Sequence, residues 1–590
     1  MMSLSLSAAF VAAIVLVAGA TRSSAGPNLA PGTLGPNGNP NAKPAAEFSQ
    51  DVTWPAVLPN NWIIGEVGGL TVDSNDNIWV YHRPGTITSD EYGSAQVPIQ
   101  EYCCFPAPPV LEFNQSPAGL PIGAGRVLQA WGPIEGIGIT PSSGEGVSTA
   151  CKNISSQGMN GPGTSCNQSP IPSYPAFLTG SGITSTLWFQ DDSSTSNTAA
   201  GVGSGGEHGI AVDGSGFVWL SGDSTDDAQI LKCTQQTNGV YTPGAYMYGL
   251  MALFTPQSSN GNCVAAIGAE EQPYDPTGLP AGSCPNNLTT TWVCRAAQVY
   301  VDSSSNGYSD NNVYVADGVS QGSPGGNNRV AEFNCPQSLS ACTFVRAWGA
   351  YGVTASSGAV TTGYGTIPPL AATYPYTLGS YNGTNPTSHF EDVHCITRDP
   401  ATGYLWVCDR FNDRVQVFTP TGGYVGQCYF ATSPAYTTND NGAPENIPAI
   451  ATLASAGTTA SGYGSTWNMT FLPRTGHPKG PPNEIVILLD GTNSIAREFY
   501  PIPDPGTGTT SGAQYCPSAG QFGWAARHPG QWHSPQVGDI DSKGNYFTGE
   551  GVDGGAGFNG KRLQRFFQHG GPKPPKPPPP PPPKPPKPPK

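Results

Sequence analysis

Residues 392–418 read DVHCITRDPATGYLWVCDRFNDRVQVF, and this stretch decides the fold class. An alternating apolar run is followed by a turn, by a second run that ends in Asp409, and by a third run that begins at Arg414. A fourth run follows at residues 423–430. Short apolar runs separated by turn residues are typical of antiparallel strands. The stretch therefore predicts a four-stranded antiparallel meander.

Similar units recur along the chain. Each unit joins two short hydrophobic runs rich in Val, Tyr and Trp, and the first runs begin near Gly69, Gly209, Gln298, Asp392, Trp467 and Val537. One four-stranded sheet cannot bury both of its faces, whereas sheets arranged around an axis bury one another. Six units of unequal length therefore predict an all-β fold, a six-bladed β-propeller.

The composition agrees with this fold class. Gly (77 residues) and Pro (61 residues) are abundant, and charged residues make up only 11% of the 590 residues. A helical bundle or coiled coil needs periodic runs rich in Ala, Glu, Lys and Leu, so both are excluded. The formal net charge is −15. An acidic body repels phosphate backbones, which excludes nucleic acid as a partner.

The propeller is expected to occupy residues 51–570, and other segments are expected to flank it. The sixth unit lacks a recognisable fourth strand, so residues 51–60 (DVTWPAVLPN) are predicted to supply it and close the ring. Residues 133–206 and 351–388 are rich in Gly, Ser and Thr and are predicted to be long loop inserts. The flanking segments are a signal peptide at 1–20, a disordered lead-in at 21–50 and a disordered Lys/Pro-rich tail at 571–590.

The N-terminus and the cysteines both indicate export. Residues 8–20 form a short apolar run that ends in Ala18-Gly19-Ala20, which is typical of a signal peptide. No Lys or Arg precedes the run, so an uncleaved N-terminal anchor is the alternative. We expect a secreted or otherwise extracytoplasmic protein (periplasm, cell surface or extracellular), with no transmembrane span after processing.

Fourteen cysteines without a CxxC motif favour disulfides over a metal or haem site. Three pairs are close enough in the sequence to be predicted as hypotheses. They are Cys395–Cys408, Cys335–Cys342 and Cys151–Cys166.

One repeat position identifies a candidate site. The innermost strand of each blade lines the central channel, so residues at the same position of each unit converge on the axis. Five residues before the Asp of the first strand, and at the corresponding place in the divergent fifth unit, stand Gly68, His208, Ala297, His394, Asn468 and Gln536. Two imidazoles and an amide at one rim are typical of a metal or ligand site. Taken singly, each histidine is equally typical of a hydrogen-bonded core residue.

The units resemble the NHL repeat over about residues 55–570. Asp317 with Asn328-Arg329, and Asp409 with Asp413-Arg414, match its signature best. This resemblance implies the propeller fold. It also implies a structural role for Arg329 and Arg414, because their position belongs to the repeat itself.

The arrangement further resembles the catalytic propeller of peptidyl-α-hydroxyglycine amidating lyases. These enzymes hold zinc with three histidines from three blades and cleave a carbinolamide to an amide and glyoxylate. The resemblance implies zinc at His208 and His394, with Arg83 and Arg410 as catalytic residues. The family's third zinc histidine falls on Gln536, and its catalytic tyrosine falls on Val319. A neutral amide is a weaker zinc ligand than imidazole, and His533 is an alternative third ligand if its loop bends inward.

Other interpretations of these residues stay open. Arg83 and Arg410 are equally suited to pair with acidic residues of neighbouring blades. The loop Asp223-Ser-Thr-Asp-Asp227 is a candidate for Ca²⁺, but it lacks the EF-hand spacing, so a solvated turn is favoured.

The tail repeats Lys-Pro-Pro, with lysines at 573, 576, 584, 587 and 590. Polyproline II has three residues per turn, so the tail presents lysines on one face of a stiff rod roughly 55 Å long. It is suited to an anionic wall polymer or membrane surface, or it is a solvated tail.

Three functions are consistent with these observations. The chain is expected to be an exported binding or scaffold module with a polar channel mouth that is a candidate metal site. Its partner would be a small molecule, a peptide or an extracellular protein. The alternatives are a zinc-dependent lyase of the type described above and a wall-associated structural protein.

Overall fold

The computed structural model describes the blades and part of the N-terminal segment. The described residues are 29–30, 33–35, 41, 43–87, 105–115, 125–132, 189, 206–223, 227–236, 239–246, 249–255, 263–268, 290–302, 311–318, 327–352, 390, 392–410, 414–430, 437–438, 444–445, 465–473, 484–491, 493–503, 516–524, 528–551 and 562–569. The two predicted loop inserts therefore lie almost entirely outside them, as do Val319, Cys151 and Cys166.

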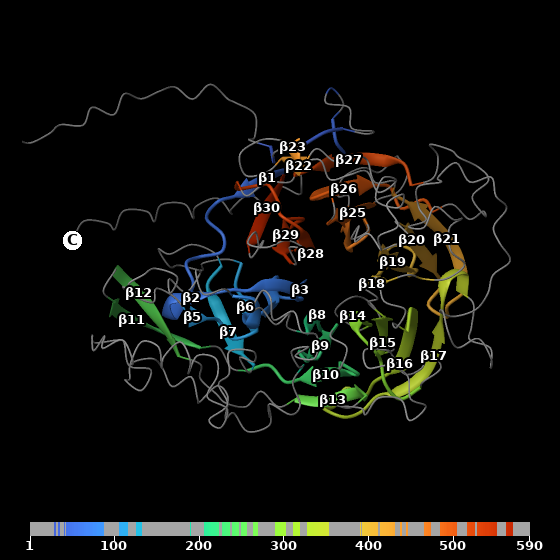
Figure 1. The fold of residues 1–590 in the computed structure, drawn as a ribbon, viewed down its shortest axis with the longest axis horizontal. Helices are drawn as coiled ribbons and strands as arrows, with labels where there is room; N and C mark the ends of the chain where they lie inside the picture. Colours follow the sequence, from blue (N-terminus) through green and yellow to red (C-terminus); the bar gives the residue numbers. More distant parts are fainter. Residues whose placement is uncertain are drawn as a thin grey trace, which may run out of the picture.

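Six four-stranded antiparallel sheets form a closed ring, which is the predicted six-bladed β-propeller (Figure 1). Blade 1 consists of β3 (Glu66–Val72), β4 (Ile78–Arg83), β6 (Val110–Phe113) and β7 (Val127–Trp131). Blade 2 consists of β8 (Glu207–Val212), β9 (Val218–Gly222), β10 (Gln229–Cys233) and β13 (Cys263–Gly268). Blade 3 consists of β14 (Ala296–Val301), β15 (Asn312–Asp317), β16 (Arg329–Asn334) and β17 (Thr343–Trp348). Blade 4 consists of β18 (Val393–Arg398), β19 (Leu405–Asp409), β20 (Arg414–Phe418) and β21 (Tyr424–Tyr429). Blade 5 consists of β24 (Asn468–Pro473), β25 (Glu484–Asp490), β26 (Ile495–Phe499) and β27 (Ser518–Phe522). Blade 6 consists of β28 (Pro535–Ile540), β29 (Tyr546–Glu550), β30 (Leu563–His569) and β1 (Glu47–Asp51).

Several short elements are not part of the six four-stranded sheets. Three two-stranded pairs are β2 (Trp62–Ile63) with β5 (Phe105–Pro106), β11 (Val240–Tyr246) with β12 (Gly249–Thr255), and β22 (Thr437–Thr438) with β23 (Pro444–Glu445). The helical turns are η2 (Pro59–Asn61), η3 (Pro84–Thr86) and η6 (Ala350–Gly352). No helix among the described residues is long and apolar enough to cross a membrane.

The first strands β3, β8, β14, β18, β24 and β28 surround the axis, and each contacts the next (Figure 1). Six hydrophobic clusters of buried side chains fill the six spaces between neighbouring blades. No blade has a core of its own, because each sheet buries its faces against two neighbours.

Asp residues fix the turn between the first and second strands. The Asp73 side chain accepts hydrogen bonds from the backbone N–H groups of Asn75 and Asn77 and from Nε1 of Trp79. Asp213 makes the same three bonds in blade 2, the last of them to Trp219. An Asp that bonds its own turn and a buried Trp links turn chemistry to the core, which explains why the pattern recurs in the sequence.

The ring closes four residues earlier in the chain than predicted. β1 (Glu47–Asp51) pairs with β30 and completes blade 6, whereas residues 51–60 were expected to do so. Phe48 decides the register, because its ring is fully buried and lies 4.7 Å from the ring of Phe522. Val52 and Val57 are 76% and 84% exposed. Residues 47–50 of the predicted lead-in are therefore part of the propeller.

Two of the predicted disulfides are confirmed, Cys395–Cys408 and Cys335–Cys342. Between described residues there are two further disulfides, Cys233–Cys263 within blade 2 and Cys428–Cys516, which joins blade 4 to blade 5. Four disulfides indicate an oxidising, extracytoplasmic environment.

Candidate functional site

A β-bulge places the candidate residues on the channel axis. The pairing between the first and second strands shifts by one residue or more across Gly68, His208, Ala297, His394 and Gln536. A bulge inserts an unpaired residue and turns its side chain away from the regular alternation of the strand. The fifth blade lacks this shift, and Asn468 stays in register.

All six residues at this register position line one opening at the end of the channel. Its free space, including the solvent at its mouth, measures ≈ 240 Å³. Three polar side chains, His208, His394 and Gln536, reach it from alternate blades. The position holds Gly68 in blade 1 because a Cβ there would lie 2.3 Å from the carbonyl oxygen of Glu207. Asn468 is used elsewhere, since its Oδ1 accepts a hydrogen bond of 3.1 Å from the backbone N–H of Gly538.

Backbone carbonyls fix the tautomer of both histidines. Nδ1 of His208 lies 2.6 Å from the carbonyl oxygen of Ala297, and Nδ1 of His394 lies 2.6 Å from that of Trp467. A carbonyl oxygen only accepts hydrogen bonds, so each Nδ1 carries the proton. Both Nε2 atoms are therefore acceptors. The two rings are 4.9 Å apart between centroids, and their lone pairs face the same space.

Gln536 closes this space with a single nitrogen. Its Nε2 lies 2.9 Å from Nε2 of His208 and 3.2 Å from Nε2 of His394. An amide –NH₂ has two hydrogens, so it can donate one to each imidazole. All three side chains are buried, at 3–4% exposure.

The electrostatic surroundings keep both imidazoles neutral. Burial lowers the pKa of His208 to about 4, and the nearby Arg83 guanidinium adds to this effect. Burial, followed by the charge of Arg410, holds the pKa of His394 well below its usual range. A neutral imidazole whose Nδ1–H is anchored to a carbonyl is the form that binds a metal ion through Nε2.

Arg83 is held by acidic and carbonyl groups. Its Nε donates to the carbonyl oxygen of Glu207 at 2.8 Å, and its Nη2 lies 3.2 Å from Oδ1 of Asp223. Its Nη1 lies 3.6 Å from Oε2 of Glu66. The side chain is thus paired within its own blade and with blade 2, as the alternative interpretation of this arginine expects.

Arg410 acts on the site through Trp467. Its guanidinium lies 4.0 Å above the Trp467 ring and pairs with Asp392, with 3.4 Å between Nη1 and Oδ2. The carbonyl of the same tryptophan orients His394. Arg410 therefore contacts the residue whose carbonyl orients His394, and its charge also acts on that imidazole.

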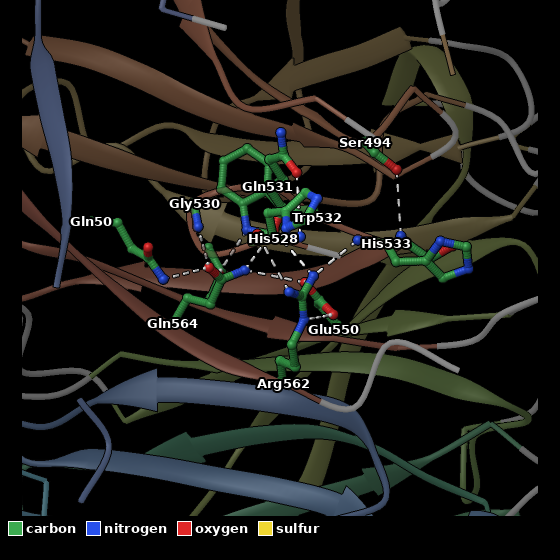
Figure 2. Close-up of polar contacts among 12 residues, drawn as sticks. Gln50, Ser494, His528, Gly530, Gln531, Trp532, His533, Glu550, Arg562 and Gln564 are labelled. Carbon is green, nitrogen blue, oxygen red and sulfur yellow. Dashed lines mark hydrogen bonds and ion pairs between the residues drawn. The ribbon is translucent and has the colours of Figure 1, made fainter. Parts of the chain in front are cut away.

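Neither His533 nor the described part of the acidic loop completes a metal site. Figure 2 shows the segment around His533 fixed by the Glu550–Arg562 ion pair, and the backbone N–H of His533 donates to Glu550. His533 does not line the opening. Asp223 lies 3.7 Å from Nε2 of His208 through Oδ2, while residues 224–226 are outside the described part of the chain. Among the described residues no three His, Cys, Asp or Glu side chains are grouped to hold a metal ion.

Sequence reasoning missed three groups that position the site. They are the carbonyls of Ala297 and Trp467, which orient the imidazoles, and Asp223, which links Arg83 to His208. A backbone carbonyl carries no residue-type signal. Asp223 had one, because it directly follows the second strand of its blade, one residue beyond the acids that end this strand in blades 3 to 6.

Comparisons with known proteins identify no family. No family model and no curated protein matches the chain. Among solved structures, virginiamycin B lyase from Staphylococcus aureus aligns at 9% identity and a TM-score of 0.29, covering 85% of this chain and 94% of its own. A putative oxidoreductase (glucose dehydrogenase) from Thermus thermophilus aligns at 9% identity and a TM-score of 0.33, covering 89% of this chain and 100% of its own.

Proposed function

We propose that this protein is an exported binding module whose channel mouth holds a divalent metal ion, zinc in the first instance, through His208 and His394. One observation carries the proposal. Two neutral imidazoles from different blades present their Nε2 lone pairs to one point, and each Nδ1–H is anchored to a carbonyl. This is the support that metal-binding histidines require.

The donor set fits zinc with two strong ligands and one weak one. Imidazole nitrogen is a preferred zinc ligand, whereas the Gln536 amide oxygen is a weaker one. A metal ion held in this way supplies a Lewis acid with open positions for an incoming donor group. The enclosed space is close to that of one water molecule, so it suits a metal ion or a single donor atom.

The test is metal binding by purified protein. We expect one zinc per chain in elemental analysis and calorimetric titration, and loss of that site in a His208→Ala/His394→Ala double variant. His528→Ala/His533→Ala is the matched control, because it removes two histidines that do not line the opening. Absence of stoichiometric zinc or any other divalent ion in the unaltered protein would eliminate the proposal.

The lyase is the second candidate, favoured by the alternate-blade arrangement of the polar residues and by the two arginines around them. It requires that Arg83 or Arg410 leave its carboxylate partner to meet a substrate. Incubation with a peptide that ends in α-hydroxyglycine and measurement of glyoxylate test it. Glyoxylate release that disappears in His208→Ala supports a lyase, and no release above the uncatalysed rate removes it.

The tail supports a separate proposal, retention of the protein on an anionic surface polymer by its Lys-Pro repeats. Deletion of residues 571–590 is expected to abolish salt-sensitive binding to such a polymer, because the tail lysines would be lost. A tail with lysines replaced by glutamine is the control for length. Unchanged retention after deletion would contradict this role and the related wall-associated structural role.

A further inference from the structure

The hydrogen bonds at the channel mouth are complete without a metal ion. Both imidazoles donate through Nδ1 to carbonyls and accept through Nε2 from the amide nitrogen of Gln536. A buried acceptor that loses its donor costs free energy. His208, His394 and Gln536 therefore satisfy one another's hydrogen-bonding groups in this arrangement.

We infer that Gln536 is a reversible latch on this site: its –NH₂ group fills both imidazole acceptors in the metal-free protein, and a metal ion binds only when the amide turns to present Oε1. The inference rests on the proposed function, because it describes how that site is regulated. It assigns Gln536 a role that a third histidine would not have, since an imidazole cannot donate to two acceptors at one point.

The carbonyls determine which face of the amide points inward. With Nδ1 protonated on both rings, two Nε2 lone pairs meet Gln536 at 2.9 and 3.2 Å. The amide oxygen would be repelled by the two Nε2 atoms, because all three are hydrogen-bond acceptors, whereas the –NH₂ group donates to each Nε2. A cation reverses this preference, because it binds the oxygen and the two imidazole nitrogens together. The same side chain is thus a donor in one state and a ligand in the other.

Gly551 keeps the place beside the amide free of a side chain. Gly551 lies against Gln536, and a Cβ on this glycine would be 2.6 Å from Cβ and 2.7 Å from Oε1 of Gln536. Exchange of oxygen and nitrogen requires rotation about the terminal torsion of the side chain, which is soft in glutamine. The bulged backbone of β28 can therefore stay in place.

Competition between the two states sets the metal affinity. In the unaltered protein a metal ion must displace two buried hydrogen bonds. A carboxylate at position 536 cannot donate when ionised, and it is a stronger metal ligand than an amide. Gln536→Glu is therefore expected to bind zinc at least about tenfold more tightly.

The experiment compares zinc titrations of three proteins by calorimetry: the unaltered protein, Gln536→Glu and Asn468→Asp. The last is the matched control, because it makes the same amide-to-carboxylate change at the same register position. Its side chain bonds the backbone of Gly538 instead of the imidazoles. Tighter binding by Gln536→Glu alone is expected from the lost donor and the stronger ligand together, so it locates the effect at this residue; equal binding by all three proteins overturns the latch while the metal site stands.

Failure of the proposed function has a different signature. Zinc bound by Gln536→Glu but not by the unaltered protein contradicts a metal-binding role and leaves the hydrogen-bonded network intact. Zinc bound by neither protein contradicts both ideas.

Nuclear magnetic resonance of the unaltered protein tests the latch without any variant. The Gln536 side-chain amide protons are expected to be protected from exchange in the metal-free state and to shift when zinc is added. Amide protons that exchange freely in the metal-free state would overturn the latch.

Discussion

The last residue of the second strand differs between blades 3 to 6 and blades 1 and 2. In blades 3 to 6 the second strand ends in an acid that pairs with an arginine in the third strand or, in blade 6, directly before it. The pairs are Asp317–Arg329, Asp409–Arg414, Asp490–Arg497 and Glu550–Arg562. In blade 1 that position holds Arg83, opposite Glu66, and in blade 2 it holds Gly222, opposite Glu207.

With an arginine instead of an acid at this position, blade 1 forms an ion pair with the next blade and not within itself alone. The repeat pair lies inside one blade and leaves the channel mouth untouched, whereas Arg83 pairs across blades with Asp223, whose other oxygen approaches His208. A repeat that keeps its pair is stabilised locally. Where the pair is absent, in blades 1 and 2, the charges of Arg83 and Asp223 lie beside His208 of the candidate site.

The largest expected effect comes from breaking a repeat pair. Asp409→Asn leaves the guanidinium of Arg414, which is fully buried, without its carboxylate. Removal of one partner of a buried ion pair costs about 3–5 kcal/mol. Denaturant unfolding should show this loss, while zinc affinity should stay unchanged in the folded protein. A large change in zinc affinity at unchanged stability would contradict the division between the two regions.

The matching change at the other region should act on the site. Asp223→Asn removes the charge 3.7 Å from Nε2 of His208 and weakens the hold on Arg83. Since a carboxylate favours a nearby cation, zinc affinity should fall about tenfold, the size of effect seen for groups that support metal ligands. Calorimetry measures it. An affinity equal to that of the unaltered protein would mean that Asp223 serves only Arg83.

The pH dependence of stability should separate outer acids from channel imidazoles. Burial raises the pKa of Glu112, Glu484 and Glu498 to about 8 from the ordinary 4.5. The folded state then holds protons that the unfolded state releases, so the free energy of unfolding falls as pH rises from about 4.5 to 8. Thermal unfolding across this range checks it, and replacement of the three glutamates by glutamine should flatten the curve.

The channel imidazoles change the free energy of unfolding in the opposite direction, at acidic pH. The pKa of His208 is lowered from 6.5 to about 4, so the unfolded state binds this proton more tightly. Stability from this group is present above about pH 6.5 and is lost as pH falls toward 4. A His208→Gln variant should weaken this acid limb, to which His394 also contributes, and keep the alkaline one; an unchanged acid limb would assign it to other groups.

The smallest effect is expected at an exposed pair between blades 1 and 6. Lys543 lies 3.5 Å from Asp76, and its side chain is 60% exposed. Exposed pairs contribute about 0–1 kcal/mol. Lys543→Ala should therefore leave denaturant unfolding nearly unchanged, which provides the baseline for Asp409→Asn. A loss as large as that of Asp409→Asn would show that burial does not explain the difference.

Local sequence predicted what local physics controls. The turn acids, the alternating runs and the disulfides Cys395–Cys408 and Cys335–Cys342 depend on residues close in the chain. The closing strand was misplaced because its register depends on Phe48 fitting beside Phe522, a contact between distant segments. Arg83 and Arg410 resembled ligand-facing arginines, and the structure gives each of them a carboxylate partner, an arrangement that the sequence also allowed.

The sequence by itself determined the repeat and its register, because alternation, turn chemistry and the Asp–Arg pair act within one blade. It therefore placed His208, His394 and Gln536 at one level of the ring. Only the tertiary structure decided how they meet. The bond from Gln536 to His208 spans 328 residues and that to His394 spans 142, and their geometry depends on bulges and on carbonyls of neighbouring blades. Ring closure brings these groups together, and no short stretch of sequence records which atoms then face one another.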